Sequence, residues 1–160
     1  ESFRIVKHKE MPLFWAVRGD WAIKTKIQEL INEAESELSI ACIKTEILHE
    51  ISGMLIGLDK KIRCLLMRDD EIVEKLNNVK FKIIKTPFFG RLAELFEGVE
   101  DEGIRFEIEC LIIIDNRRSI VILEENGKRS AVLISLPALA YIQKTFYDTI
   151  WMNQKLPLQD

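Results

Sequence analysis

The chain has 160 residues, 48% of them hydrophobic and 31% charged, with a formal net charge of −3. A chain of this length forms about one domain and can bury roughly 70% of its unfolded surface, so this composition excludes disordered and fibrous classes. The slightly acidic charge disfavours nucleic-acid binding by this chain alone, and no apolar run reaches the ~18 residues of a bilayer span. We therefore expect a soluble, cytoplasmic protein without a membrane partner.

Three cysteines, Cys42, Cys64 and Cys110, lie far apart, each within an apolar run. Their odd number and wide spacing fit a reducing cytoplasm better than a disulfide framework. We interpret them as small core residues rather than as metal ligands or nucleophiles.

Residues 1–12 are polar, and we predict that they form a leading segment or the tail of a linker. Residues 13–160 are predicted to form a single domain. Up to residue 85, short apolar runs alternate with segments in which apolar residues recur at helical spacing. These patterns predict, in order, a strand at 13–17, a helix at 21–37, a strand at 38–43, a helix at 46–58, a strand at 61–67, a short helix at 72–76 and a strand at 79–85.

The predicted helices are preceded by residues suited to capping, namely Asp20, Thr45 and either Asp69 or Asp70. Strands that alternate with helices indicate βαβ units and parallel pairing. Residues 86–103 are harder to assign, because proline, glycine and acidic residues alternate there with large apolar ones. They are either a helix that covers a pocket or a partner chain, or an ordinary part of the core.

The most informative stretch is 107–123, where the apolar run Cys110–Ile114 ends at Asp115, a polar turn follows, and a second apolar run begins at Ile120. The pattern predicts two strands joined by a tight turn, the first of them buried on both faces. Because open α/β sheets bind ligands at strand ends, we expect Asp115 to mark the binding site. A strand at 131–135 and a closing helix at 137–154 complete the prediction.

Three segments resemble one known family. They are Trp15-Ala-Val-Arg-Gly-Asp-Trp-Ala-Ile-Lys leading into a helix with Glu33-Ala34, the Leu-Ile-Ile-Ile-Asp-Asn hairpin at 111–116, and the terminal helix with Phe146 and Trp151. Over residues 13–152 they resemble the phospholipase-D-like C-terminal domain of archaeal TrmB-type transcriptional regulators. The resemblance implies an α/β fold, a three-layer α/β/α sandwich with a mixed, mostly parallel sheet. It also implies a domain that senses an effector, often a sugar, and helps to form dimers.

The phospholipase D superfamily uses a His-x-Lys-x4-Asp motif, in which the histidine attacks phosphorus and the lysine binds phosphate oxygens. Aligning the motif aspartate with Asp115 places Ile108 and Cys110 where the histidine and lysine belong. We therefore predict a pseudoenzyme, with no catalytic residues. No glycine-rich phosphate loop or paired-histidine spacing is present, so no cofactor or metal is predicted. The alternatives are a phosphodiesterase or nuclease with a non-standard site around Asp115, and an interaction module without a ligand.

For the effector pocket we select polar residues in turns and at strand ends. They are Arg18, Asp20, Lys44, Thr45, Arg68, Asp115 and Asn116. The expected partners are a second copy of the chain, a sugar or sugar phosphate, and DNA only through a winged helix outside this chain. Arg117-Arg118 and Lys128-Arg129 are predicted to form a basic patch on two neighbouring turns.

Overall fold

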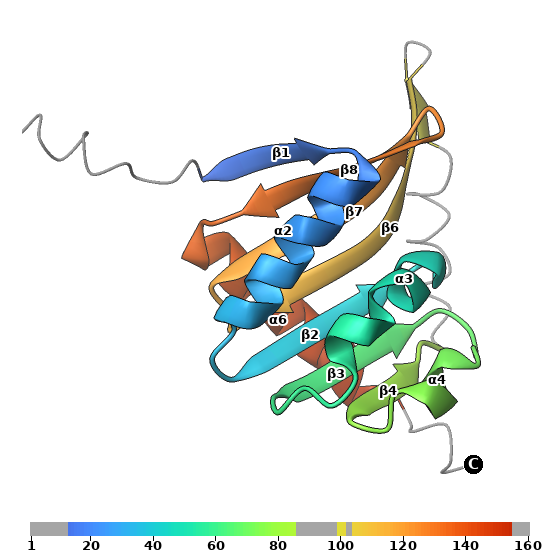
Figure 1. Cartoon of the computed structure of the whole chain (residues 1–160), viewed down its shortest axis with the longest axis vertical. Coiled ribbons are helices and arrows are strands. Elements are labelled where there is room, and N and C mark those ends of the chain that lie inside the picture. The colour runs from blue at the N-terminus through green and yellow to red at the C-terminus, as the bar shows by residue number, and fades with distance from the viewer. Residues whose placement is uncertain (1–12, 86–98, 102–103, 155–160) are drawn as a thin grey trace, which may run out of the picture.

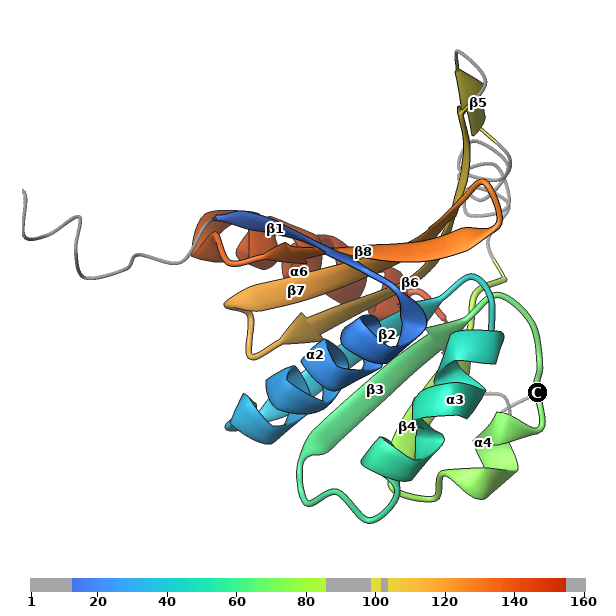
Figure 2. The ribbon, with the colours of Figure 1, turned by 45° about the horizontal axis from the view of Figure 1, so that its top comes forward.

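The computed structural model describes residues 13–85, 99–101 and 104–154, and these residues fold around one eight-stranded mixed sheet. The strands follow the order β1-β8-β7-β6-β2-β3-β4 (Figure 1), and β5, labelled in Figure 2, pairs with the start of β6. Their bounds are Phe14–Arg18 (β1), Glu37–Cys42 (β2), Lys61–Leu66 (β3), Val79–Ile83 (β4), Val99–Asp101 (β5), Ile104–Ile114 (β6), Arg118–Glu125 (β7) and Lys128–Ile134 (β8). The predicted leading segment 1–12 and most of 86–103 lie outside the described residues.

The helices lie on both faces of this sheet. Their bounds are Asp20–Glu33 (α2), Glu46–Leu55 (α3), Ile72–Lys75 (α4) and Pro137–Met152 (α6). Helices α2, α3 and α4 cover one face, and α6 crosses the other (Figure 2). The predicted three-layer α/β/α sandwich is therefore confirmed. None of the helices in the described part of the chain is long and apolar enough to cross a membrane.

The sheet is parallel in one half and antiparallel in the other. Strands β2, β3 and β4 are mutually parallel, as expected for βαβ units. The other pairs among the described strands are antiparallel, so parallel pairing is confined to this half rather than covering most of the sheet as predicted. The reason is that β6, β7 and β8 follow one another as antiparallel hairpins. Strand β1 pairs antiparallel with β8 instead of joining the parallel βαβ units.

The direction of β6 separates two groups of strand ends. We name the ends of the sheet after the parallel strands, so that β2 and β3 finish at the carboxyl end and begin at the amino end. In the antiparallel pair of β2 and β6, Cys42 lies opposite Cys110 and Leu38 opposite Ile114. The chain therefore leaves β6 toward Asp115 at the amino end, whereas it leaves β2 toward Lys44 at the carboxyl end.

Helix α2 has the predicted apolar face, with Ile23, Ile27, Leu30 and Ile31 buried in the main core. It ends at Glu33, four residues before the predicted end, and Glu37 already belongs to β2. The N–H groups of residues 35 to 37 donate to the Asp115 carboxylate instead of to helical carbonyls. The Asp115 side chain, about 80 positions away in the sequence, thus accepts the hydrogen bonds of backbone N–H groups that a longer helix would have used.

Two of the residues predicted to cap helices, Asp20 and Thr45, do not form a side-chain capping hydrogen bond. The N-cap of α2 is Gly19, with a positive φ of 92° that glycine adopts readily, and Asp20 is already the first helical residue. Thr45 is the N-cap of α3, but its side chain forms no capping hydrogen bond. The N-cap of α4 is Glu71 and not the predicted Asp69 or Asp70, although the Asp70 carboxylate accepts the N–H of Ile72 at 2.9 Å.

Helix α6 is attached to β2 and β3 through polar contacts as well as apolar packing. The Tyr147 hydroxyl donates to the carbonyl oxygen of Ile40 at 2.9 Å, and the guanidinium of Arg63 lies 2.6 Å from the carboxylate of Asp148. Arg63 is buried, and it also stacks on the ring of Trp151. These contacts fix α6 to the two strands whose far ends form the site described next.

Candidate functional site

The carboxyl end of the sheet holds a pocket of about 620 Å3, a volume within the range of sites that bind small molecules. The loops after β2 and β3 and the first residue of α3 supply one part of its wall, and β6, β7 and β8 supply the rest. Its described lining has three basic and four acidic side chains among ten residues: Ile43, Lys44, Thr45, Glu46, Met67, Arg68, Asp70, Glu109, Glu124 and Arg129. The pocket thus brings together the predicted residues Lys44, Thr45 and Arg68.

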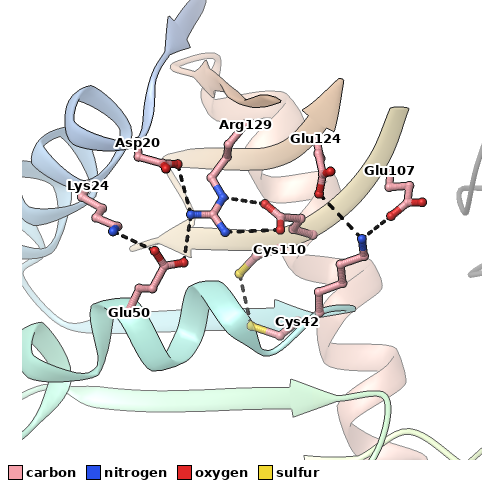
Figure 3. A network of polar contacts seen from close by, with 10 residues as sticks. Asp20, Lys24, Cys42, Glu50, Glu107, Cys110, Glu124 and Arg129 are labelled. Carbon is pink, nitrogen blue, oxygen red and sulfur yellow. Dashed lines mark hydrogen bonds and ion pairs between the residues drawn. The ribbon is translucent and has the colours of Figure 1, made fainter. Parts of the chain in front are cut away.

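Arg129, near the start of β8, binds three carboxylates at the pocket wall (Figure 3). Its Nε lies 2.8 Å from Glu109, and its Nη1 lies 2.9 Å from Glu50 and 3.2 Å from Asp20. Glu50 also accepts a contact from Lys24 at 2.7 Å. The hydrogen bond to Glu109, which is only 3% exposed, raises the pKa of Arg129 further above its usual value. The guanidinium charge is therefore neutralised within the protein.

Lys44 lies between two acidic side chains at the same end of the sheet, Glu107 and Glu124, both of which are labelled in Figure 3. Its ammonium group donates to Glu107, and it lies 3.8 Å from the carboxylate of Glu124. The hydrogen bond to Glu107 raises the pKa of Lys44. Lys44 thus resembles Arg129 in being neutralised by the chain's own carboxylates.

A third polar group links α3 to the loop after β3. The Thr45 hydroxyl donates to Asp70 at 2.8 Å, and His49 Nε2 donates to the same carboxylate at 2.7 Å. Burial alone would raise the pKa of Asp70, but the N–H of Ile72 and the Thr45 and His49 donors lower it below its usual value. Asp70 therefore holds the pocket loop and α3 together as a carboxylate.

Arg18 and Asp20 reach the same end from the first strand. Arg18 is exposed opposite Ser130 in the β1–β8 pair, and the adjacent Gly19 N–H lies 3.5 Å from the Arg129 carbonyl oxygen. Asp20 contacts Arg129 directly. Five of the seven predicted residues are therefore at the carboxyl end: Arg18, Asp20, Lys44, Thr45 and Arg68.

Asp115 and Asn116 lie at the amino end, away from this pocket. Both have positive φ angles, 52° and 61°, in the turn between β6 and β7. The Asp115 carboxylate accepts the N–H groups of Glu35 at 2.7 Å and of Ser36 and Glu37 at 2.9 Å, and the Ser36 hydroxyl at 2.8 Å. Burial would raise the pKa of Asp115, but these donors lower it to about 2. This carboxylate organises the backbone at the start of β2.

The expected basic patch is absent from the described structure. Both hairpins exist, but Arg118 lies at the amino end and Arg129 at the carboxyl end, because successive turns of an antiparallel series alternate between the ends of the sheet. Arg118 pairs with Glu33 at 2.7 Å, and Arg129 belongs to the pocket.

Sequence reasoning left several residues out of the site, among them Glu109, Glu124 and Arg129, the last of which it assigned to the basic patch. One signal was available, since Glu109 is a charged residue within the apolar run Ile108–Ile114. The β6–β7 register also shifts between Ile108 and Cys110, which marks a bulge at Glu109. A buried acid in a strand needs a cationic partner, but the sequence did not identify which of the many basic residues supplies it.

The residues at the positions expected for the phospholipase D histidine and lysine can neither attack phosphorus nor bind phosphate oxygens. Ile108 is half-buried and Cys110 is fully buried in the main core. Among the described residues, no group of three or more His, Cys, Asp or Glu side chains is arranged to hold a metal ion.

Solved structures with a similar fold include a phospholipase D family member. NucT from Helicobacter pylori has a TM-score of 0.58 and 11% identity, over 89% of this chain and 98% of that chain. Nuc from Salmonella typhimurium, a phospholipase D family member, has a TM-score of 0.52 and 9% identity, over 89% of this chain and 96% of that one. The fold is therefore that of a phospholipase-D-like α/β domain.

The sequence defines the family more narrowly. A family described as "Transcriptional regulator TrmB, EBD N-terminal subdomain" matches residues 13–156, and the chain belongs to this family. TrmBL2, an archaeal chromatin protein, is similar in structure, with a TM-score of 0.54 and 14% identity over 97% of this chain. This chain spans 59% of the length of TrmBL2. No curated protein matches the sequence.

Proposed function

We propose that this chain is the effector-sensing and dimerisation domain of a cytoplasmic TrmB-like regulator, and that it has no catalytic activity. The observation that carries the proposal is the pocket at the ends of β2 and β3, because these two strands also hold α6. Lys44 and Arg68 follow the strands into the pocket, while Ile40 and Arg63 bind α6. A ligand that favours one arrangement of the strand ends would thereby favour one position of α6. DNA binding belongs to a domain outside this chain.

The absence of catalysis is supported by the residues at the motif positions. Neither Ile108 nor Cys110 can replace the histidine that attacks phosphorus and the lysine that binds its oxygens. Asp115, on which the enzyme alternative was based, already accepts four hydrogen bonds from the chain and lies at the other end from the pocket. A phosphodiesterase at Asp115 would have to disrupt the start of β2.

The charges in the pocket favour a neutral sugar over a sugar phosphate. Phosphate binding requires cations that are available to the anion, usually arginine or lysine donors. Lys44 and Arg129 already bind carboxylates, and acidic side chains outnumber basic ones in the described lining. A phosphate would be repelled by these acids, whereas sugar hydroxyls can donate to them. We propose an uncharged polyhydroxylated ligand for this pocket.

A thermal-shift screen tests the ligand proposal. A neutral sugar at ~100 times its Kd adds about 2.7 kcal/mol to the free energy of unfolding, which raises Tm by roughly 5–10 °C for a chain of this size. We expect this shift with a neutral sugar and not with its phosphate. Arg68→Ala should reduce it, because the exposed Arg68 side chain lines the pocket.

The matched control for that screen is Arg117→Ala. Arg117 is an exposed arginine at the amino end of the sheet, so its removal should leave the sugar-induced shift unchanged. A larger shift with sugar phosphates would contradict the neutral-ligand proposal. A shift that both arginine variants retain in full would place the ligand outside this pocket.

The surface proposed for dimerisation is the outer face of α6. It exposes Tyr141 by 65%, Ile142 by 62%, Phe146 by 51% and Met152 by 80%, and the exposed residues between them include Thr145 and Thr149. This uncharged face can pack against its own copy without bringing like charges together. Since a buried aromatic side chain alone covers roughly 150–250 Å2, these residues supply much of the ~800 Å2 that each partner buries in a typical interface.

Ile142→Glu is expected to raise the dimer dissociation constant at least tenfold, or about 1.4 kcal/mol, because a two-fold interface would bury the new charge twice. Sedimentation equilibrium of this chain measures the change. Ile56→Glu is a matched control, because Ile56 is 59% exposed but follows α3 on the opposite face of the sheet. An equal effect of both substitutions, or a wild-type chain that stays monomeric, would reject α6 as the dimer surface.

A further inference from the structure

Beneath the pocket, the thiols of Cys42 and Cys110 face each other across β2 and β6 (Figure 3). The two Sγ atoms are 3.3 Å apart. The adjacent Ile43 N–H donates to the Glu109 carbonyl oxygen at 2.8 Å. Ile43 and Glu109 therefore form a hydrogen-bonded pair of the ladder, and Cys42 and Cys110 form the neighbouring non-hydrogen-bonded pair. Residues opposed at such a non-hydrogen-bonded position of an antiparallel pair have Cα atoms about 4.5 Å apart and closely spaced side chains.

This arrangement meets the backbone requirement for a disulfide. Disulfides join residues whose Cα atoms are about 4.4–6.8 Å apart, and the S–S bond is about 2.05 Å long. The two sulfurs therefore need to approach by only about 1 Å. Cys64 is equally buried, but its directly opposed neighbours are Ile40 and Phe81, so it has no thiol across from it in either strand pair.

We propose that Cys42 and Cys110 form an oxidisable dithiol that a hydroperoxide converts into an intramolecular disulfide. In the first step the Cys42 sulfur attacks a peroxide oxygen, the O–O bond breaks, and the alcohol leaves with the thiol proton. In the second step the Cys110 sulfur attacks the resulting sulfenic acid, the S–O bond breaks, and water leaves. Two thiols and one hydroperoxide thus give one disulfide, one alcohol and one water.

Cys42 is the expected site of the first attack because of its position. It is the last residue of β2, directly before Ile43 and Lys44 in the pocket lining. The Cys110 and Cys64 thiols lower the pKa of Cys42, whereas the pKa of Cys110 is raised. Cys42 is only 2% exposed, so the reaction requires the strand ends to open and should be slower than that of a surface thiol.

The disulfide would change the floor of the pocket. Lys44 follows Cys42 by two residues, and Glu109, which holds Arg129, immediately precedes Cys110. The bond would therefore join the two pocket-bearing segments covalently. The proposal rests on the cysteine geometry alone, so it can succeed or fail independently of the effector and dimerisation proposals.

The test is a thiol count after treatment of the native chain with hydrogen peroxide. The chain has three cysteines, and the count in denaturant should fall from three to one. Peptide mapping should find Cys42 joined to Cys110 within a monomer, and a dithiol reductant should restore all three thiols. Cys64→Ala is the matched control, and it should still lose both of its thiols. Cys42→Ala and Cys110→Ala should form no intramolecular disulfide.

Three results would overturn the proposal: a disulfide that includes Cys64, a disulfide between two chains, or retention of all thiols under conditions that oxidise the denatured chain. Thermal unfolding of each reduced variant shows whether it is folded before oxidation. If an alanine variant does not fold, the peptide map of the oxidised wild-type chain decides the question by itself.

Discussion

Replacing Arg129 by leucine is expected to lower the free energy of unfolding by about 3–5 kcal/mol, because it leaves a buried carboxylate without its partner. Arg129 donates to both Glu109 oxygens, at 2.8 and 3.4 Å, and Glu109 is only 3% exposed. Urea denaturation monitored by circular dichroism measures the loss. The substitution also removes the cation between Asp20 and Glu50, which adds repulsion at the pocket wall.

Two controls separate the buried charge from the loss of an arginine. The double substitution Arg129→Leu with Glu109→Leu should regain most of the stability, because replacing a whole buried ion pair by apolar groups is often nearly neutral. Arg118→Leu should cost less than about 1 kcal/mol, since its partner Glu33 is 53% exposed. If Arg129→Leu cost no more than Arg118→Leu, the Glu109–Arg129 pair would not be what holds this end of the sheet.

Asp115→Asn is expected to lower the free energy of unfolding by about 2 kcal/mol at neutral pH. The amide cannot accept all four hydrogen bonds that the carboxylate receives from residues 35 to 37. The start of β2 depends on those bonds, so the variant should also exchange the backbone amides of these residues faster. Chemical denaturation and hydrogen exchange provide the two measurements.

The lowered pKa of Asp115 predicts that the free energy of unfolding depends on pH. The pKa of Asp115 is about 2 in the folded chain, against an ordinary value of 3.8. Because the folded value is the lower one, this contribution is fully present above pH 4 and disappears as the pH falls from about 4 to 2. The stability difference between wild type and Asp115→Asn should shrink over that range. Asp59→Asn, at an exposed aspartate, is the matched control for this measurement.

These two predictions assign different tasks to the two ends of the sheet. The amino end is organised by Asp115, which we expect to matter for stability and not for the effector. The carboxyl end contains the pocket, the neutralised cations and the cysteine pair. A variant at Asp115 that lost stability but kept its sugar-induced shift would support this division.

The sequence alone determined the local elements, because helices and strands follow from the spacing of apolar residues along a short stretch. The apolar positions of α2 and the hairpin around Asp115 were predictable in this way. The family was also recognisable from local segments, such as the Trp15 to Lys24 stretch and the Leu111–Asn116 hairpin. Local spacing also indicated polar residues at strand ends, and five of the seven chosen residues lie at the carboxyl end.

Only the tertiary structure decided which strand ends meet. The sequence does not state that β6 runs antiparallel to β2, and that direction places Asp115 far from Lys44. It also does not pair Glu109 with Arg129, 20 residues away, or Asp20 with Arg129, 109 residues away. Such partners are selected when strands pack side by side and buried charges must be neutralised, and that selection depends on the whole sheet rather than on any local pattern.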